Sequence, residues 1–153
     1  MRAGERGFTY VWVMAAVAIL GVGLAAMGSL WSDDARRERE QEALRIGRLY
    51  AEAIDSYYRA SPGSAKLYPP SLEALLEDTR FVGTYRHLRR LYGDPLRPGQ
   101  PWSVVRGADG RVRGVASTSE DAPLRQEPLD LGVVVLPAAR KYSEWQFVPR
   151  IDG

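Results

Sequence analysis

The stretch that decides the fold is residues 6–31, RGFTYVWVMAAVAILGVGLAAMGSLW, which holds no charge after Arg6. A helix rises about 1.5 Å per residue, so the 24 uncharged residues from Phe8 to Trp31 would span about 36 Å, enough to cross a bilayer. The arginines just before this run favour a cytoplasmic amino terminus. We therefore predict a leader over 1–7 and a transmembrane half-helix over 8–31.

The helical pattern continues beyond the apolar run. Residues 32–42 are dense in charge, Glu40 included, and we expect them to be solvated near the membrane surface. Contacts with neighbouring subunits are the alternative. Apolar side chains then recur at helical spacing. This stripe consists of Leu44, Gly47, Ala51, Ile54 and Tyr58, with Tyr50 and Tyr57 beside it. We predict one long helix from about Phe8 to Ala60, whose periplasmic half over 32–60 packs its stripe against the chain's own head.

The head, residues 61–153, combines short helical and strand patterns. Ser71 is a suitable N-cap for a short helix over Leu72–Asp78. An Asp-Gly pair at 109–110 separates two apolar runs and indicates a β-hairpin. The other elements expected are a helix over Tyr85–Tyr92, strands over Trp102–Arg106, Arg111–Ser117, Gly132–Leu136 and Trp145–Val148, and a loop over Glu120–Asp130. The expected fold class is α+β, a long amino-terminal helix on a small head with a few antiparallel strands.

Arg6-Gly7-Phe8-Thr9, placed after a short basic leader, resembles the start of type IV pilins and type II secretion pseudopilins. In that family a prepilin peptidase cuts after the glycine, and the new first residue, Phe8 here, is N-methylated. The resemblance implies a pilin-like fold and a structural subunit of a type II secretion or type IV pilus assembly. It implies a single-pass inner-membrane protein with its amino terminus in the cytoplasm and its head in the periplasm. The implied partners are other pseudopilins or pilins, prepilin peptidase, an inner-membrane assembly platform and membrane lipid.

One position departs from that family. Its members usually carry Glu at the fifth mature position, where this chain has Trp12. In the family this Glu pairs with a neighbour's amino terminus during assembly, so the departure implies a minor subunit. Gly21, Ala25 and Ser29 recur every four residues, a spacing that allows close helix approach in lipid. The alternative is the ordinary abundance of small residues in membrane helices. The assembly residues expected are Phe8, Thr9, Trp12, Gly21, Ala25 and Ser29.

The head carries a second, patchier resemblance. Residues 68–75, YPPSLEAL, resemble the segment that follows the long helix in major pseudopilins. Asp94-Pro95, followed by Gly99, Pro101 and Trp102, resembles the Asp-Pro, Gly, Pro-aromatic stretch of that family.

No pattern in the sequence indicates catalysis. The chain has no cysteine and a net charge of only +2, which argues against thiol chemistry and a nucleic-acid partner. His87, the one histidine, is expected on the surface among Arg86, Arg89 and Arg90. Those arginines form either a solvated face or a contact for an acidic neighbour. We predict a protein that is not an enzyme.

We also predict no cofactor and no metal site. Some major pseudopilins bind calcium in a carboxy-terminal loop, and oxygen ligands suit that ion. Glu120, Asp121 and Asp130 lie in the corresponding loop here, but they do not reproduce the Asp-rich pattern of those proteins. A solvated acidic loop is the expected reading.

Two other readings of the amino terminus remain open. A secretory signal cleaved after Ala26-Met27-Gly28 would give a mature chain that starts near Ser29. The second reading is an anchor that is not cleaved. Either would fit a secreted or anchored periplasmic binding module with no filament role.

Overall fold

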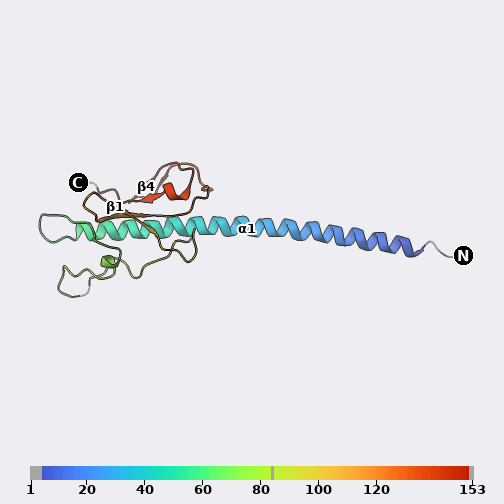
Figure 1. Cartoon of the computed structure of the whole chain (residues 1–153), viewed down its shortest axis with the longest axis horizontal. Helices are drawn as coiled ribbons and strands as arrows, with labels where there is room; N and C mark the ends of the chain where they lie inside the picture. Colours follow the sequence, from blue (N-terminus) through green and yellow to red (C-terminus); the bar gives the residue numbers. More distant parts are fainter. Residues whose placement is uncertain (1–4, 84, 152–153) are drawn as a thin grey trace. The chain divides into compact units, whose positions relative to one another are not determined.

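The structure, a computed structural model, describes residues 5–83 and 85–151, and within the first helix it describes side chains at 10–21 and from 33 onward. The chain divides into two compact units, Met1–Glu38 and Arg39–Gly153. The elements, shown in Figure 1, are α1 (Glu5–Arg59), the 3-10 helix η1 (Glu73–Leu75), β1 (Ser103–Arg106), β2 (Val112–Ala116), β3 (Leu129–Asp130), β4 (Val135–Leu136), the 3-10 helix η2 (Tyr142–Glu144) and β5 (Gln146–Phe147). The fold class is α+β.

The expected transmembrane half of the helix is corrected by the structure. Over the residues described, no helical stretch combines the length and the apolar character that a membrane span requires. A span takes about 20 apolar residues. The apolar stretch with described side chains, 10–21, is shorter than this, and the stretch from 33 to 59 is rich in charge.

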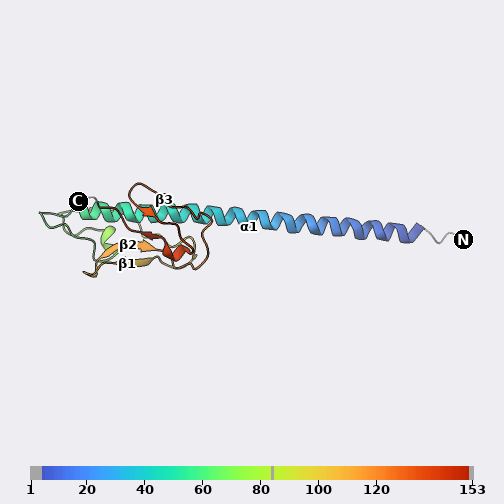
Figure 2. The same cartoon turned by 90° about the horizontal axis from the view of Figure 1, so that it is seen from above.

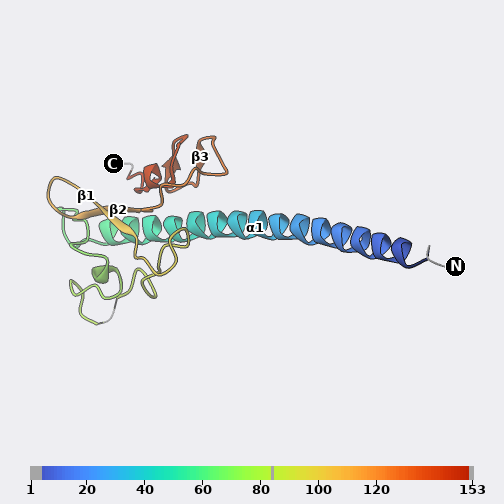
Figure 3. The same cartoon turned by 45° about the vertical axis from the view of Figure 1, so that its right-hand side comes forward.

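The sheets are small and antiparallel. β1, β2 and β5 form a three-stranded sheet in that order, and β3 pairs with β4. β1 and β2 lie side by side in Figures 2 and 3, with Ser103 opposite Ala116. The predicted hairpin is confirmed, and Gly110 in its turn has a φ of 73°, a conformation that suits glycine. β3 was not predicted, because its two residues fall in the expected loop.

Two predicted helices of the head are wrong. Over Leu72–Asp78 only the single turn η1 forms, and its N-cap is Leu72, not Ser71. Over Tyr85–Tyr92 there is no helix. The reason is long-range hydrogen bonding, because the amides of His87 and Leu88 both donate to the carbonyl of Leu75, each at 2.9 Å. These two amides therefore bond to the last residue of η1 and not to the segment's own preceding turn.

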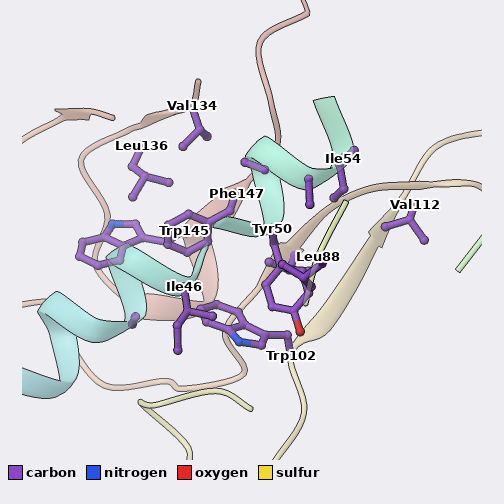
Figure 4. Packing of buried hydrophobic residues seen from close by; sticks show 14 of the residues in the cluster. Ile46, Tyr50, Ile54, Leu88, Trp102, Val112, Val134, Leu136, Trp145 and Phe147 are labelled. Atoms are coloured by element: carbon purple, nitrogen blue, oxygen red, sulfur yellow. The ribbon is translucent and has the colours of Figure 1, made fainter. Parts of the chain in front are cut away.

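The core forms around residues 39–59 of α1. In Figure 2, η1, β1 and β2 lie on the same side of this part of the helix. The prediction that the stripe packs on the chain's own head is confirmed, since Ala51, Ile54 and Tyr50 are at most 1% exposed. The buried face is wider than predicted and also includes Ala43, Ile46 and Ala53, while Leu44 and Tyr58 lie at its edge. Figure 4 shows Ile46, Tyr50 and Ile54 among Trp102, Val112, Trp145 and Phe147.

Gly47 lies where the helix packs closely against Phe147 of β5. A Cβ built on it would fall 2.4 Å from the ring of Phe147. Real Cβ atoms do not come so close to a ring, so β5 packs on the helix at a distance that only glycine permits. In the sequence, Gly47 interrupts the apolar stripe because it has no side chain. In the structure, the Phe147 ring occupies that space.

The stretch around Asp94 is a closed turn. The Asp94 amide donates to the carbonyl of Gln100 at 3.0 Å, and Gly93 pairs with Pro101 in an isolated bridge. The Trp102 indole donates to the Gly93 carbonyl at 3.1 Å. The buried carboxylate of Asp94 accepts hydrogen bonds from the Ser117 hydroxyl and the Leu96 amide. The residues of the second resemblance thus stabilise the loop that leads into β1.

Candidate functional site

The predicted assembly residues are described only in part. Gly7, Phe8, Thr9, Ala25 and Ser29 have side-chain positions outside the described residues. The side chain of Trp12 is described, and the residue is 64% exposed. A Cβ on Gly21 would meet nothing within 4 Å.

Trp12 belongs to an exposed apolar stretch of the first unit. Eight large apolar residues are each more than half exposed: Tyr10, Val11, Trp12, Val13, Met14, Val17, Ile19 and Leu20. A contiguous exposed apolar surface usually marks an interaction site. The stretch is therefore a candidate interaction surface.

The second unit contains a buried ion pair between Asp78 and Arg80. The Asp78 side chain is fully buried, and its Oδ2 accepts from Arg80 Nη2 at 2.6 Å. The guanidinium hydrogen bonds hold the pKa of Asp78 down at about 2, against an opposing effect of burial. Arg80 also donates to Ser61 Oγ at 2.7 Å and to the Tyr57 carbonyl at 2.9 Å. The pair thus attaches the 78–80 loop to the carboxyl end of α1.

His87 is the clearest error of the sequence interpretation. Its side chain is fully buried, with Nε2 at 3.2 Å from Asp78 Oδ2 and Nδ1 at 2.8 Å from Ser56 Oγ. The Tyr57 and Tyr85 rings pack beside it. Surface exposure was expected because the neighbouring residues in sequence are arginines. The carboxylate that bonds to the buried imidazole belongs to Asp78, nine residues earlier. The spacing of these two residues in the sequence did not indicate that they are in contact.

The Ser56, His87 and Asp78 side chains form a hydrogen-bonded series that resembles a hydrolase triad in composition. Its geometry does not favour catalysis. Asp78 is already paired with Arg80, and Ser56 lies within α1, where the neighbouring backbone amides are engaged in the helix and are not available to an oxyanion. The series therefore connects α1, through Ser56, to the loop residues Asp78 and His87.

Glu40 is buried where a solvated residue was expected. Its Oε2 accepts from the hydroxyl of Tyr142 at 2.6 Å and from the amide of Leu124 at 2.7 Å. Residues 102 positions apart are thereby joined. The carboxylate holds the carboxy-terminal part of the head against the beginning of the second unit.

The segment 85–92 borders a cavity with a volume of about 420 Å³. Its walls combine apolar and charged side chains: Leu49, Glu52, Ala53, His87, Leu88, Arg89 and Tyr92. Glu52 is paired with Arg48 at 2.7 Å. Arg86, Arg89 and Arg90 are exposed, and within the described chain no ion pair joins them to a carboxylate.

The acidic loop shows no metal site among the residues described. No group of three or more His, Cys, Asp or Glu side chains gathers there. Glu120 pairs with Lys141, and Asp130 lies 3.5 Å from Arg150. Asp121 accepts from the Ser119 hydroxyl at 3.0 Å. Each of the three acidic residues is thus engaged with a neighbour in the head.

Comparison with family models, curated proteins and solved structures finds no match to this chain.

Proposed function

We propose that this chain is a pilin-like assembly subunit, processed by prepilin peptidase and incorporated as a minor component into a type II secretion or type IV pilus assembly. The observation that carries the proposal is Arg6-Gly7-Phe8-Thr9, which stands directly before the uncharged run. Its partners would be other pseudopilins or pilins and an inner-membrane assembly platform. The chain itself would perform no chemistry.

The exposed apolar residues of 10–20 support this proposal. Such a surface is unfavourable in water and is covered when neighbouring subunits pack along it. The second unit also fits a structural role, because its buried polar groups join separate parts of the head: His87 bonds to Ser56, and Glu40 bonds to Tyr142.

A second candidate is a periplasmic binding module that begins near Ser29. The cavity bordered by Leu88 and Arg89 favours this alternative, because it combines apolar walls with the charged side chains of Arg89 and Glu52. The two proposals differ in the residue at which the mature chain starts.

The deciding experiment is mass spectrometry of the mature full-length protein, expressed in a host that has prepilin peptidase. We expect a chain that begins at N-methylated Phe8. Gly7→Asp should leave the leader attached, whereas the matched change Gly4→Asp should not prevent cleavage. A mature chain that starts near Ser29, or an uncut chain in the presence of active peptidase, would contradict the assembly-subunit proposal.

A further inference from the structure

The surface formed by Arg86, Arg89, Arg90 and the adjacent cavity carries an inference about binding. Arg89 lines the cavity together with Glu52, and the Arg90 guanidinium lies beside the wall residue Tyr92. We refer to the three arginines of this segment and the cavity walls Leu49, Glu52, Ala53, Leu88 and Tyr92 as the basic-rimmed pocket. We propose that it binds a short acidic segment of a partner protein through one bulky apolar side chain flanked by carboxylates. The inference goes beyond the assembly-subunit proposal, which rests on residues of the first unit, because every residue of this pocket lies in the second unit.

The charges of this surface are unevenly matched. On the nearby face of α1, Arg45 pairs with Glu42 and Arg48 pairs with Glu52. These carboxylates are therefore already satisfied. The three arginines of the loop have no carboxylate partner in the part of the chain that the structure describes. Their positive charge is left for a ligand.

The Arg90 guanidinium is held in place by an aromatic ring. The Arg90 guanidinium lies 4.9 Å from the centroid of the Tyr92 ring, an arrangement that restricts a flexible side chain. Tyr92 is itself fixed, since the Tyr50 hydroxyl bonds to both its amide and its carbonyl. A guanidinium held in this way can bind a carboxylate through two parallel hydrogen bonds. Arg89 lies at the cavity wall, so a carboxylate bound there would be next to a side chain in the cavity.

The cavity limits the apolar part of the ligand. Its volume of about 420 Å³ lies at the lower end of the range for ligand sites, which suits a single large side chain and its backbone. The apolar walls come from α1 and from the loop, and both parts are fixed by the core, as Leu88 in Figure 4 shows. An aromatic or leucine side chain with acidic neighbours one or two residues away matches this arrangement.

An anionic membrane surface is a poorer match. Recognition of anionic lipid usually uses clusters of four to eight Lys and Arg. The segment beside the cavity has three arginines, of which Arg89 lines it, and the apolar part is a cavity and not a protruding wedge. The chemistry therefore favours a peptide over a lipid headgroup.

The test measures fluorescence polarisation with the purified full-length protein in dilute non-ionic detergent. The probes are labelled peptides EELFDE and DELWEE, with KKLFKK and EESSDE as controls that change the charge or remove the apolar side chains. We expect saturable binding of the two acidic apolar peptides, with at least tenfold weaker binding of both controls. Binding should also weaken as salt is raised.

Protein variants locate the site. Arg89→Glu with Arg90→Glu should weaken binding at least tenfold, whereas Arg125→Glu, an exposed arginine in another loop, should leave it unchanged. Circular dichroism of each variant verifies that the head is folded. Absence of saturable binding, equal binding of KKLFKK, or unchanged binding by the double variant would overturn the proposal. Two further results would also overturn it when the acidic peptides do not bind. One is binding to phosphatidylglycerol vesicles that depends on these arginines, and the other is self-association that depends on them.

Discussion

The Tyr50 hydroxyl donates a hydrogen bond to the carbonyl of Tyr92 at 3.0 Å and accepts one from the Tyr92 amide at 2.8 Å. A single side chain of α1 thus satisfies both backbone groups of a residue 42 positions away. The Tyr50 ring is buried against Trp102 and Tyr92. This contact fixes the irregular segment 85–92, which has no secondary structure of its own.

Tyr50→Phe should therefore destabilise the second unit. The change keeps the ring but leaves the Tyr92 amide and carbonyl without their partner, which costs about 1–3 kcal/mol. Denaturant unfolding followed by tryptophan fluorescence measures the loss, because Trp102 and Trp145 are buried in this unit. Tyr85→Phe is the matched control, since Tyr85 is 46% exposed, and it should change the free energy of unfolding by less than about 0.5 kcal/mol. Equal losses in the two variants would contradict the role of Tyr50.

Glu40 and Tyr142 should be energetically coupled. Their hydrogen bond is buried and involves a carboxylate, so a double-mutant cycle with Glu40→Ala and Tyr142→Phe should give about 1–3 kcal/mol. Glu38→Ala with Tyr142→Phe serves as the control cycle, because Glu38 is exposed on the same helix. That cycle should show coupling near zero. Additive effects of Glu40→Ala and Tyr142→Phe would show that the contact does not hold the head.

Asp78 should make stability depend on pH at the acid end. Its pKa is about 2 in the folded protein and 3.8 in its unperturbed state, so the carboxylate stabilises the fold above pH 4. This contribution, about 2 kcal/mol, is lost as the pH falls from about 4 to about 2. Unfolding titrations of wild type and Asp78→Asn between pH 2 and pH 7 measure it. The difference in stability between the two should shrink over this acid interval, and a difference that stays constant would refute the assignment.

Gly47→Ala should destabilise the packing of β5 on α1. The added methyl group would overlap the Phe147 ring, and such overpacking costs about 1–3 kcal/mol despite the higher helix propensity of alanine. Gly21→Ala is the control, because its methyl group would meet nothing within 4 Å, and it should cause no loss. Combining Gly47→Ala with Phe147→Leu should cost less than the sum of the two single changes. Full additivity would show that the ring is not the obstacle.

Trp12 leads to a prediction about assembly that rests on the proposed function. A carboxylate at this position could attract a neighbour's positive amino terminus, whereas an indole cannot. We expect that the chain alone, overexpressed in a host with prepilin peptidase but without other pseudopilins, forms no filaments. Electron microscopy of sheared surface fractions and membranes is the measurement. Long filaments made of this chain alone would show that it is not a minor subunit.

Local sequence signals determined several parts of this protein. The helical spacing of Ala51, Ile54 and Tyr50 predicted the buried face of α1, because periodicity reports which side of a helix is apolar. The Asp109-Gly110 pair predicted the hairpin, because its turn needs a residue with positive φ. The missing cysteine and the small net charge also followed from the sequence alone.

Tertiary structure decided the rest. His87 and Glu40 were expected at the surface, yet both are buried, since their partners Asp78 and Tyr142 are brought to them only by the fold. The helix expected over 85–92 does not form, because the Leu75 carbonyl and the Tyr50 hydroxyl take its backbone groups. Periodicity describes a segment's own preference, whereas a buried polar group takes the conformation in which its hydrogen bonds are satisfied. That requirement depends on residues far along the chain, and the sequence pattern does not contain it.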